Sequence, residues 1–190
     1  MNKKCNKINW LLFKSPQCLI TIFVVLSLLF GAKVGDNHLR VEWLLAEHQF
    51  SLEGIDRQDF VRMLVKTSRE NGLDPLLVLA MMKVESQFQI TAHSSRGALG
   101  LLQIKPIAAK QIQEMLPFKI RSNKDLLDPY KNLVVGVSYL AHLKSNFDSD
   151  LEKMIVAYNA GPTATKKMKK LPQRYLTKVL LAYNQFKRNG

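Results

Sequence analysis

A glutamate at position 85 is the carboxylate of this sequence best suited to acid–base chemistry. It lies close in sequence to Met81, Met82, Val84 and Phe88. Such neighbours keep water away from a carboxyl group, which disfavours its charged form and raises its pKa towards the range that a general acid needs near neutral pH. A lone glutamate on a helix is more often a solvated surface residue, so the rest of the sequence has to separate these two interpretations.

The sequence after Glu85 offers no second carboxylate, since neither Asp nor Glu occurs from Ser86 to Gln113. Enzymes that cleave glycosidic bonds usually place two carboxyl groups on either side of the bond. A partner for Glu85 would therefore come from elsewhere in the fold, or a group of the substrate would replace it. Gly97 and Gly100 mark turns in the same region, and glycine lets the backbone approach a ligand closely.

A buried helix is expected to position Glu85. Asp74-Pro75 is typical of a helix start, with a side-chain cap followed by a proline whose missing N–H is no loss at the first helical position. The seven apolar residues from Leu76 to Met82 favour a helix by their length, and their apolar character all round implies burial. Glu85 would then lie on the last turn of this helix.

Helices are expected along the rest of the chain as well, and no internal repeat or longer alternating run predicts a β-strand. The expected helices follow Asp59 over 60–71, restart around Pro106 within 101–116, run from Asp128-Pro129 to 147, span 151–160 up to Gly161-Pro162, and cover 172–187. The sequence therefore predicts an all-α fold.

The amino-terminal segment differs from the rest of the chain. Residues 1–35 carry five lysines and no acid, and residues 15–32 carry no charge at all. This pattern predicts a basic n-region followed by an apolar signal-anchor, which would send the following chain out of the cytoplasm. A cleaved signal peptide is the alternative, but Ala32 and Phe30 make a poor cleavage site because small residues are wanted at both positions.

The charge distribution divides the remainder into a stem and a body. Residues 36–56 carry one base and five acids, and we interpret them as an acidic stem with a short helix. Residues 57–190 carry 22 basic and 10 acidic residues and no cysteine. We expect one exported catalytic domain over 57–190, for which an oxidising compartment poses no redox hazard.

Three short blocks of the body carry a resemblance. They are Glu85-Ser86-Gln87-Phe88, then Gly97-Ala98-Leu99-Gly100-Leu101-Leu102-Gln103, then Ala157-Tyr158-Asn159-Ala160-Gly161. In order and spacing they are similar to the signature blocks of the soluble lytic transglycosylase (SLT) domain family, and the stretch with Asp128-Pro129, Asn132, Gly136 and Tyr139-Leu140 also fits. The resemblance covers roughly residues 57–188. Each block alone is weak, whereas three in order are strong.

The resemblance implies a lysozyme-like helical domain that cleaves the MurNAc-β-1,4-GlcNAc bond of peptidoglycan without water and leaves 1,6-anhydro ends. Glu85 matches the catalytic glutamate, acting first as acid and then as base, and the 2-acetamido group of the sugar would replace the second carboxylate. The resemblance further implies substrate-binding roles, with Tyr158 as a hydrogen-bond partner of Glu85. These roles fall on Ser94, Gln103, Tyr158, Asn159 and Tyr175. Leu102 and Lys105 depart from the family pattern, which has methionine more often at both positions.

The expected partners are peptidoglycan glycan strands and, through the amino-terminal segment, the inner membrane, with the body on its periplasmic face. A lysozyme-type hydrolase of similar fold and an inactive wall-binding module remain as alternatives. Nucleic-acid binding is not expected, because an exported body would rarely meet nucleic acid and no binding motif accompanies the basic charge. No cofactor is expected either, and the histidines at positions 38, 48, 93 and 142 lack the spacing of metal ligands.

Overall fold

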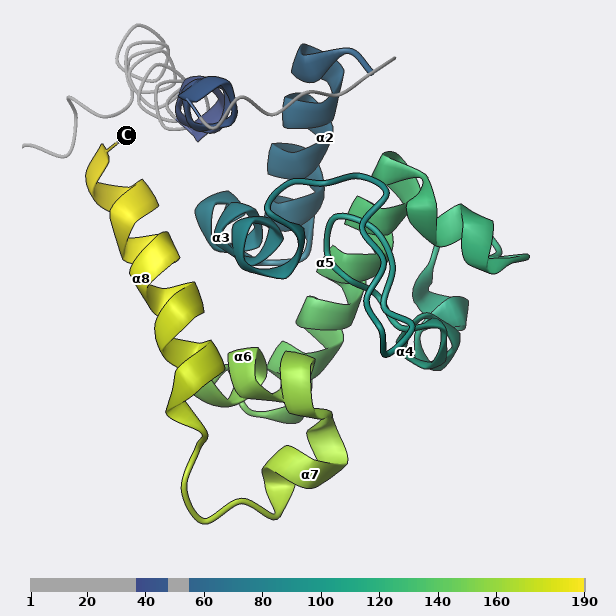
Figure 1. Ribbon diagram of the computed structural model, residues 1–190, viewed down its shortest axis with the longest axis vertical. Helices are drawn as coiled ribbons and strands as arrows, with labels where there is room; N and C mark the ends of the chain where they lie inside the picture. The colour runs from purple at the N-terminus through teal and green to yellow at the C-terminus, as the bar shows by residue number, and fades with distance from the viewer. Residues whose placement is uncertain (1–36, 48–54, 190) are drawn as a thin grey trace, which may run out of the picture. The chain divides into compact units, whose positions relative to one another are not determined.

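The computed structural model describes residues 37–47 and 55–189 (Figure 1). The chain divides into two units, Met1–Asn37 and His38–Gly190, and the helices described below belong to the second apart from Asn37, the last residue of the first unit. Among the residues described, no helix combines the length and the apolar character needed to cross a bilayer. The predicted signal-anchor over 1–35 lies outside the described residues.

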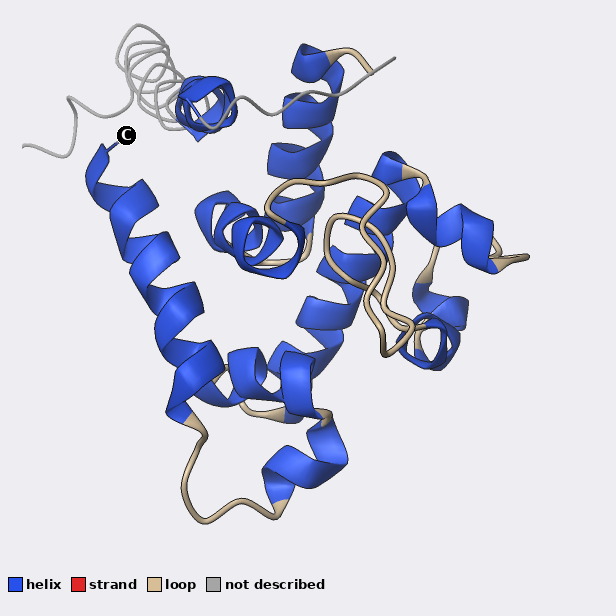
Figure 2. Cartoon of the chain, viewed as in Figure 1, coloured by secondary structure: helices blue, strands red, loops and turns tan. Residues whose placement is uncertain are grey.

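Helices make up the second unit, and no β-strand lies among its described residues (Figure 2). The predicted all-α fold is confirmed. Residues 37–47 are helical. The elements that follow are α2 (Arg57–Glu70), α3 (Pro75–Ser86), α4 (Pro106–Gln111), η2 (Gln113–Met115), η3 (Asn123–Leu127), α5 (Pro129–Asn146), α6 (Leu151–Ala160), α7 (Pro162–Lys166) and α8 (Gln173–Asn189).

Both predicted Asp-Pro helix starts are present. The Asp74 side chain accepts a hydrogen bond from the Leu76 amide at 2.9 Å and caps α3. Asp128 caps α5 in the same way, with its carboxylate 2.8 Å from the Lys131 amide. Each bond satisfies a backbone N–H that has no partner inside the helix, and such a cap typically contributes about 1 kcal/mol.

Two helix boundaries differ from the prediction. Helix α2 begins at Arg57, three residues earlier than expected, because Asp56 and not Asp59 provides the cap. The helix around Pro106 covers only Pro106–Gln111. Residues 99–104 before it form a tight turn, in which the Leu99 and Ile104 backbones exchange two hydrogen bonds of 3.1 and 2.9 Å. A residue that precedes proline is also disfavoured in the helical conformation, which keeps Lys105 extended.

The core gathers around α3, whose residues from Pro75 to Met82 are all buried. This helix packs against α2 and α8. The Tyr183 hydroxyl on α8 donates to the Asp74 carboxylate at 2.6 Å and so ties the two helices together near the start of α3. Burying a leucine or methionine side chain stabilises the fold by about 1.5–3 kcal/mol. This buried helix therefore holds the residues on its last turn in fixed positions.

Residues 38–47, from the segment interpreted as a stem, pack with the body. Val41, Leu44 and Leu45 are fully buried in the same core as α3. The Arg40 guanidinium donates to the Lys187 carbonyl of α8. This part of the segment therefore lies against the helical domain.

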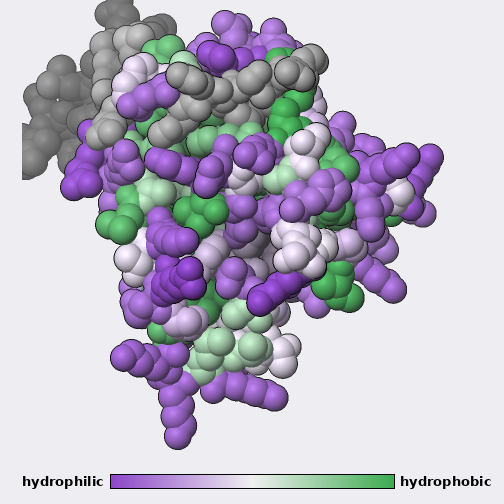
Figure 3. All heavy atoms as spheres, in the orientation of Figure 1, coloured by the Kyte–Doolittle hydropathy of each residue, from purple (hydrophilic) through white to green (hydrophobic). Residues whose placement is uncertain are grey.

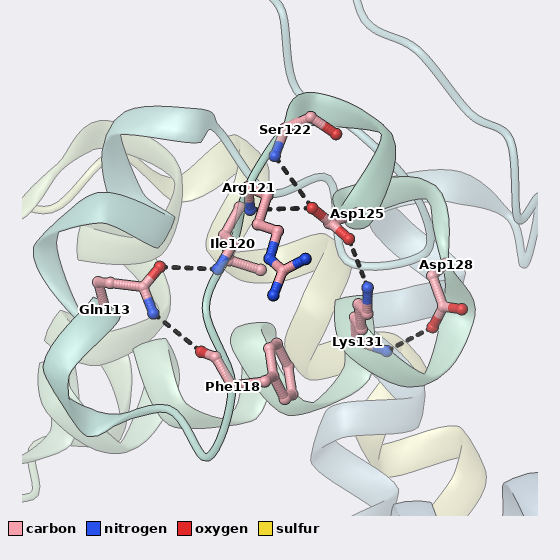
Figure 4. A network of polar contacts seen from close by, with 8 residues as sticks. All are labelled: Gln113, Phe118, Ile120, Arg121, Ser122, Asp125, Asp128 and Lys131. Atoms are coloured by element: carbon pink, nitrogen blue, oxygen red, sulfur yellow. Dashed lines mark hydrogen bonds and ion pairs between the residues drawn. The ribbon is translucent and has the colours of Figure 1, made fainter.

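Polar side chains hold the segment between α4 and α5 (Figure 4). Gln113 donates to the Phe118 carbonyl and accepts from the Ile120 amide, both at 2.9 Å. The Asp125 carboxylate accepts from the Arg121 and Ser122 amides and from the Lys131 ammonium group, and these bonds lower its pKa to about 2. The network fixes η3 against the first turn of α5. This turn also carries Asn132, which binds the Leu126 carbonyl of η3.

Candidate active site

Glu85 lies on the last turn of α3 and lines a cleft of about 810 Å³. The side chain is only partly exposed. Its Oε1 atom accepts a hydrogen bond from the Tyr175 hydroxyl of α8. A partly buried carboxyl group that lines a cleft, with one oxygen held by a hydrogen-bond donor, has the geometry of a positioned acid or base.

Burial raises the pKa of Glu85 from its ordinary value of 4.5 to about 7. Two groups oppose this increase, because the Tyr175 hydroxyl and the positive charge of Lys105 both favour the charged carboxylate. The balance leaves the group able to give a proton and to take one back near neutral pH, as a single acid–base residue must.

Tyr175 reaches Glu85 from the first turn of α8, and it is not among the described residues that line the cleft. Burial, together with the neighbouring Glu85, raises its pKa well above 10. The phenol therefore stays protonated and remains a hydrogen-bond donor to the glutamate.

Tyr158 lines the cleft, but its hydroxyl donates to the Leu102 carbonyl at 2.7 Å and not to Glu85. The predicted hydrogen-bond partner of the glutamate is thus replaced by Tyr175. The Tyr158 ring packs against Tyr139 on α5, with 5.6 Å between ring centroids. Its neighbour Asn159 is exposed and also lines the cleft.

The loop from Gln87 to Lys105 brings Ser94 and Gln103 to the same cleft. The Ser94 oxygen accepts from the Ala98 amide at 2.9 Å, which leaves its own proton to be donated. Gln103 has a positive φ of 47°, and its side-chain NH₂ donates to the Ala92 and Gly100 carbonyls at 3.0 and 2.9 Å. With both amide protons used, its carbonyl oxygen is the group left for a ligand.

Asn132 is a positioning residue whose role the sequence did not predict. It is fully buried on α5 and makes three hydrogen bonds of 2.7–2.9 Å. Two reach the loop, where Asn132 donates to the Leu99 carbonyl and accepts from the Leu102 amide, and in the third it donates to the Leu126 carbonyl of η3. Gly100 passes directly over it, and a side chain there would collide with Asn132 and the Leu126 carbonyl. The sequence feature that could have predicted this role is a polar residue within a mostly apolar helix, because a polar group that is buried needs hydrogen-bond partners.

The SLT family model, described as the transglycosylase SLT domain, matches residues 62–181. The chain belongs to this family.

Curated relatives and solved structures agree with this assignment. A membrane-bound lytic murein transglycosylase C from Mannheimia succiniciproducens is 31% identical over 132 residues, 64% of this chain and 36% of the relative. The protein of the same name from Actinobacillus succinogenes is 36% identical over 116 residues, 55% of this chain and 31% of the relative. This chain therefore spans about a third of the length of the curated relatives that it matches.

Two crystal structures share the fold. One is an inactive mutant of the lytic transglycosylase Slt from Pseudomonas aeruginosa, with a TM-score of 0.61. The other is the 70 kDa soluble lytic transglycosylase from Escherichia coli, with a TM-score of 0.59. Each is 25% identical in sequence, and each match covers 67% of this chain and 24% of the other.

The two departures from the SLT pattern lie in different surroundings. Leu102 is fully buried against Gly136 of α5, where any side chain on the glycine would meet it. This exchange therefore concerns core packing. Lys105 is exposed, caps no helix with its side chain, and lines the cleft near Glu85. It brings a positive charge to the SLT cleft.

Within the described part of this SLT domain, no three His, Cys, Asp or Glu side chains gather as ligands for a metal ion. Glu85 is also the only acid among the described residues that line the cleft. The carboxyl group of Glu85 can transfer a proton, and the polar side chains of the cleft can form hydrogen bonds with a ligand.

Proposed function

We propose that this SLT domain is a peptidoglycan lytic transglycosylase in which Glu85 is the catalytic acid and base. The observation that carries the proposal is a glutamate of pKa about 7 in a cleft whose described lining holds no second carboxylate. A two-carboxylate hydrolysis needs a partner across the bond, whereas a reaction that uses the substrate's own groups does not.

In the proposed reaction, protonated Glu85 donates its proton to the oxygen that joins MurNAc C1 to GlcNAc. The C1–O bond breaks, and the GlcNAc residue leaves with a new hydroxyl. The 2-acetamido group of MurNAc stabilises the positive charge at C1. The C6 hydroxyl of the same sugar then attacks C1 and gives its proton to the Glu85 carboxylate. No water is consumed, and the glutamate regains the proton that it lost.

The other site residues are proposed to bind and orient the sugar. Ser94 keeps a donor proton, which suits it to the acetamido carbonyl. Gln103 offers a carbonyl oxygen, and Asn159 offers an exposed amide at the rim. We propose Tyr158 as part of the sugar-binding wall, held in place by Leu102, and Tyr175 as the group that orients Glu85.

The names of the similar proteins support this proposal. The two curated relatives are called lytic murein transglycosylases. The Pseudomonas structure is an inactive mutant in which a glutamine replaces a glutamate, which agrees with a mechanism that depends on one such residue.

Product analysis tests the proposal. The full chain and its Glu85→Gln variant would be incubated with purified peptidoglycan, and the fragments identified by mass spectrometry. We expect 1,6-anhydro ends from the wild type and a loss of about a hundredfold to ten-thousandfold in rate for the variant, because glutamine cannot transfer the proton. Glu114→Gln, which changes an exposed glutamate outside the cleft, is the matched control and should stay active.

The same digest separates the alternatives. Reducing ends without anhydro ends would identify a lysozyme-type hydrolase of the same fold. Wild-type chain that binds peptidoglycan but releases no fragments would identify a wall-binding module.

We also propose the arrangement of the chain at the envelope. Residues 1–35 would anchor it in the inner membrane, and residues 57–190, with residues 38–47 packed against them, would form the catalytic domain on the periplasmic side. The relatives are named as membrane-bound. Intact-mass measurement of the membrane fraction tests the anchor, since a cleaved signal peptide would shorten the protein by about 30 residues.

A further inference from the structure

Three cations surround the cleft that holds Glu85. Arg96 comes from the loop after α3, Lys105 precedes α4, and Lys167 follows α7. All three are exposed. Since Glu85 is the only acid among the described lining residues, the cleft carries a clear excess of positive charge.

The chain does little to neutralise these charges. Neither Arg96 nor Lys167 forms an ion pair with another described residue. From Lys153 to the end of the sequence there are nine basic residues and no acid. Figure 3 has the orientation of Figure 1. In it, hydrophilic side chains project from the surface around α7 and the loop that leads to α8. A cationic lining of this kind suits an anionic ligand.

The glycan backbone itself supplies few charges, but the peptides attached to MurNAc carry free carboxylates. Each peptide begins at the sugar whose C1–O bond would be broken beside Glu85. Its carboxylates are therefore held near the rim of the cleft, within reach of long and flexible lysine and arginine side chains. A separate anionic polymer of the wall would have no such fixed position.

We propose that Arg96, Lys105 and Lys167 bind the free carboxylates of these peptides, so that the cleft selects glycan strands with charged peptides over strands with neutral ones. The inference rests on the proposed lytic transglycosylase function and names the substrate form that the site prefers. Exposed ion pairs of this type are weak singly, and each contributes up to about a fivefold preference.

The test compares two forms of one substrate. Peptidoglycan is used untreated or after its peptide carboxylates have been converted to amides, which leaves the glycan and the peptide length unchanged. The readout is the ratio of kcat/KM for the untreated and the amidated form, measured with the full chain. We expect a ratio of about ten at low salt and a fall towards one at about 0.5 M salt, where the charges are screened.

A double variant locates the effect. Arg96→Gln with Lys167→Gln should lower the ratio several-fold, and Lys105 is left in place because it also acts on Glu85. Lys169→Gln with Lys170→Gln makes the same change of charge on exposed residues outside the cleft lining, and it should leave the ratio unchanged. Thermal unfolding of both variants checks that the fold is kept.

Different results overturn different claims. A wild-type ratio near one at low salt, an unchanged ratio in the Arg96/Lys167 variant, or an equal fall in the Lys169/Lys170 control would each overturn the inference about peptide carboxylates. Absence of anhydro products from both substrate forms would instead overturn the proposed function.

Discussion

Tyr175 and Glu85 lie 90 residues apart in the sequence, and the hydroxyl of the first donates a hydrogen bond to the carboxylate of the second. The bond joins the first turn of α8 to the last turn of α3. This hydrogen bond favours the charged form of Glu85, whereas burial disfavours it. Because the donor comes from α8 and the carboxylate from α3, both helices influence the pKa of Glu85.

Tyr175→Phe should move the alkaline limb of the pH–rate profile to higher pH. The hydroxyl lowers the pKa of Glu85, so its loss raises this pKa above about 7 and keeps the acid protonated further into the alkaline range. The profile of kcat/KM on peptidoglycan measures the shift. Tyr183→Phe makes the same exchange on the same helix, where the hydroxyl binds Asp74, and should leave the limb in place. A shift to lower pH for Tyr175→Phe would contradict the assigned hydrogen bond.

Lys105→Met should shift the same limb in the same direction. The lysine's positive charge favours ionised Glu85, and without it the pKa of the glutamate rises. Lys110→Met removes a charge from an exposed position on α4 outside the cleft lining and serves as control. Identical profiles for the two variants would show that the charge of Lys105 does not act on the glutamate.

Glu85→Gln should stabilise the fold at alkaline pH relative to the wild type. The pKa of Glu85 is raised in the folded state, from 4.5 to about 7, so its contribution to stability is fully present below pH 4.5 and is lost as the pH rises through 7. The loss amounts to about 3 kcal/mol, whereas glutamine does not titrate. Urea unfolding of both proteins at pH 4.5 and pH 8 measures the difference. A gap between the two that does not change with pH would argue against the raised pKa.

Gly100→Ala should destabilise the fold much more than Gly97→Ala. Both glycines have positive φ, 73° and 75°, so both substitutions pay a similar backbone strain of about 1 kcal/mol. Only at Gly100 would the added methyl group collide with Asn132 and the Leu126 carbonyl, since the space around Gly97 is open. We expect a further loss of about 2 kcal/mol or more at Gly100. Equal free energies of unfolding for the two variants would mean that the loop can move away from Asn132.

The sequence predicted the features that depend on neighbouring residues. The all-α fold, the caps at Asp74 and Asp128 and the burial of the helix before Glu85 follow from local signals, and the structure confirms them. Ser94, Gln103, Tyr158 and Asn159 also come to the same cleft as Glu85, although their contacts with a sugar stay predictions.

The partner of Glu85 could not be read from the sequence. Both Tyr158 and Tyr175 are tyrosines close to the cleft, and the choice between them depends on how α6 and α8 pack against α3. In the structure the Tyr158 hydroxyl donates a hydrogen bond to the Leu102 carbonyl, and the Tyr175 hydroxyl donates one to the Glu85 carboxylate. The positioning role of Asn132 could not be predicted for a related reason. Its three hydrogen-bond partners lie on segments that meet only when α5 packs against the loop.

The late position of Tyr175 has a consequence for biosynthesis. A nascent chain interrupted anywhere before α8 would already contain the glutamate, the serine and the glutamine, yet its acid would lack both its donor and the helix that buries it. Under the proposed function, products truncated before α8 should therefore cleave peptidoglycan poorly, because the hydrogen bond from Tyr175 to Glu85 is missing.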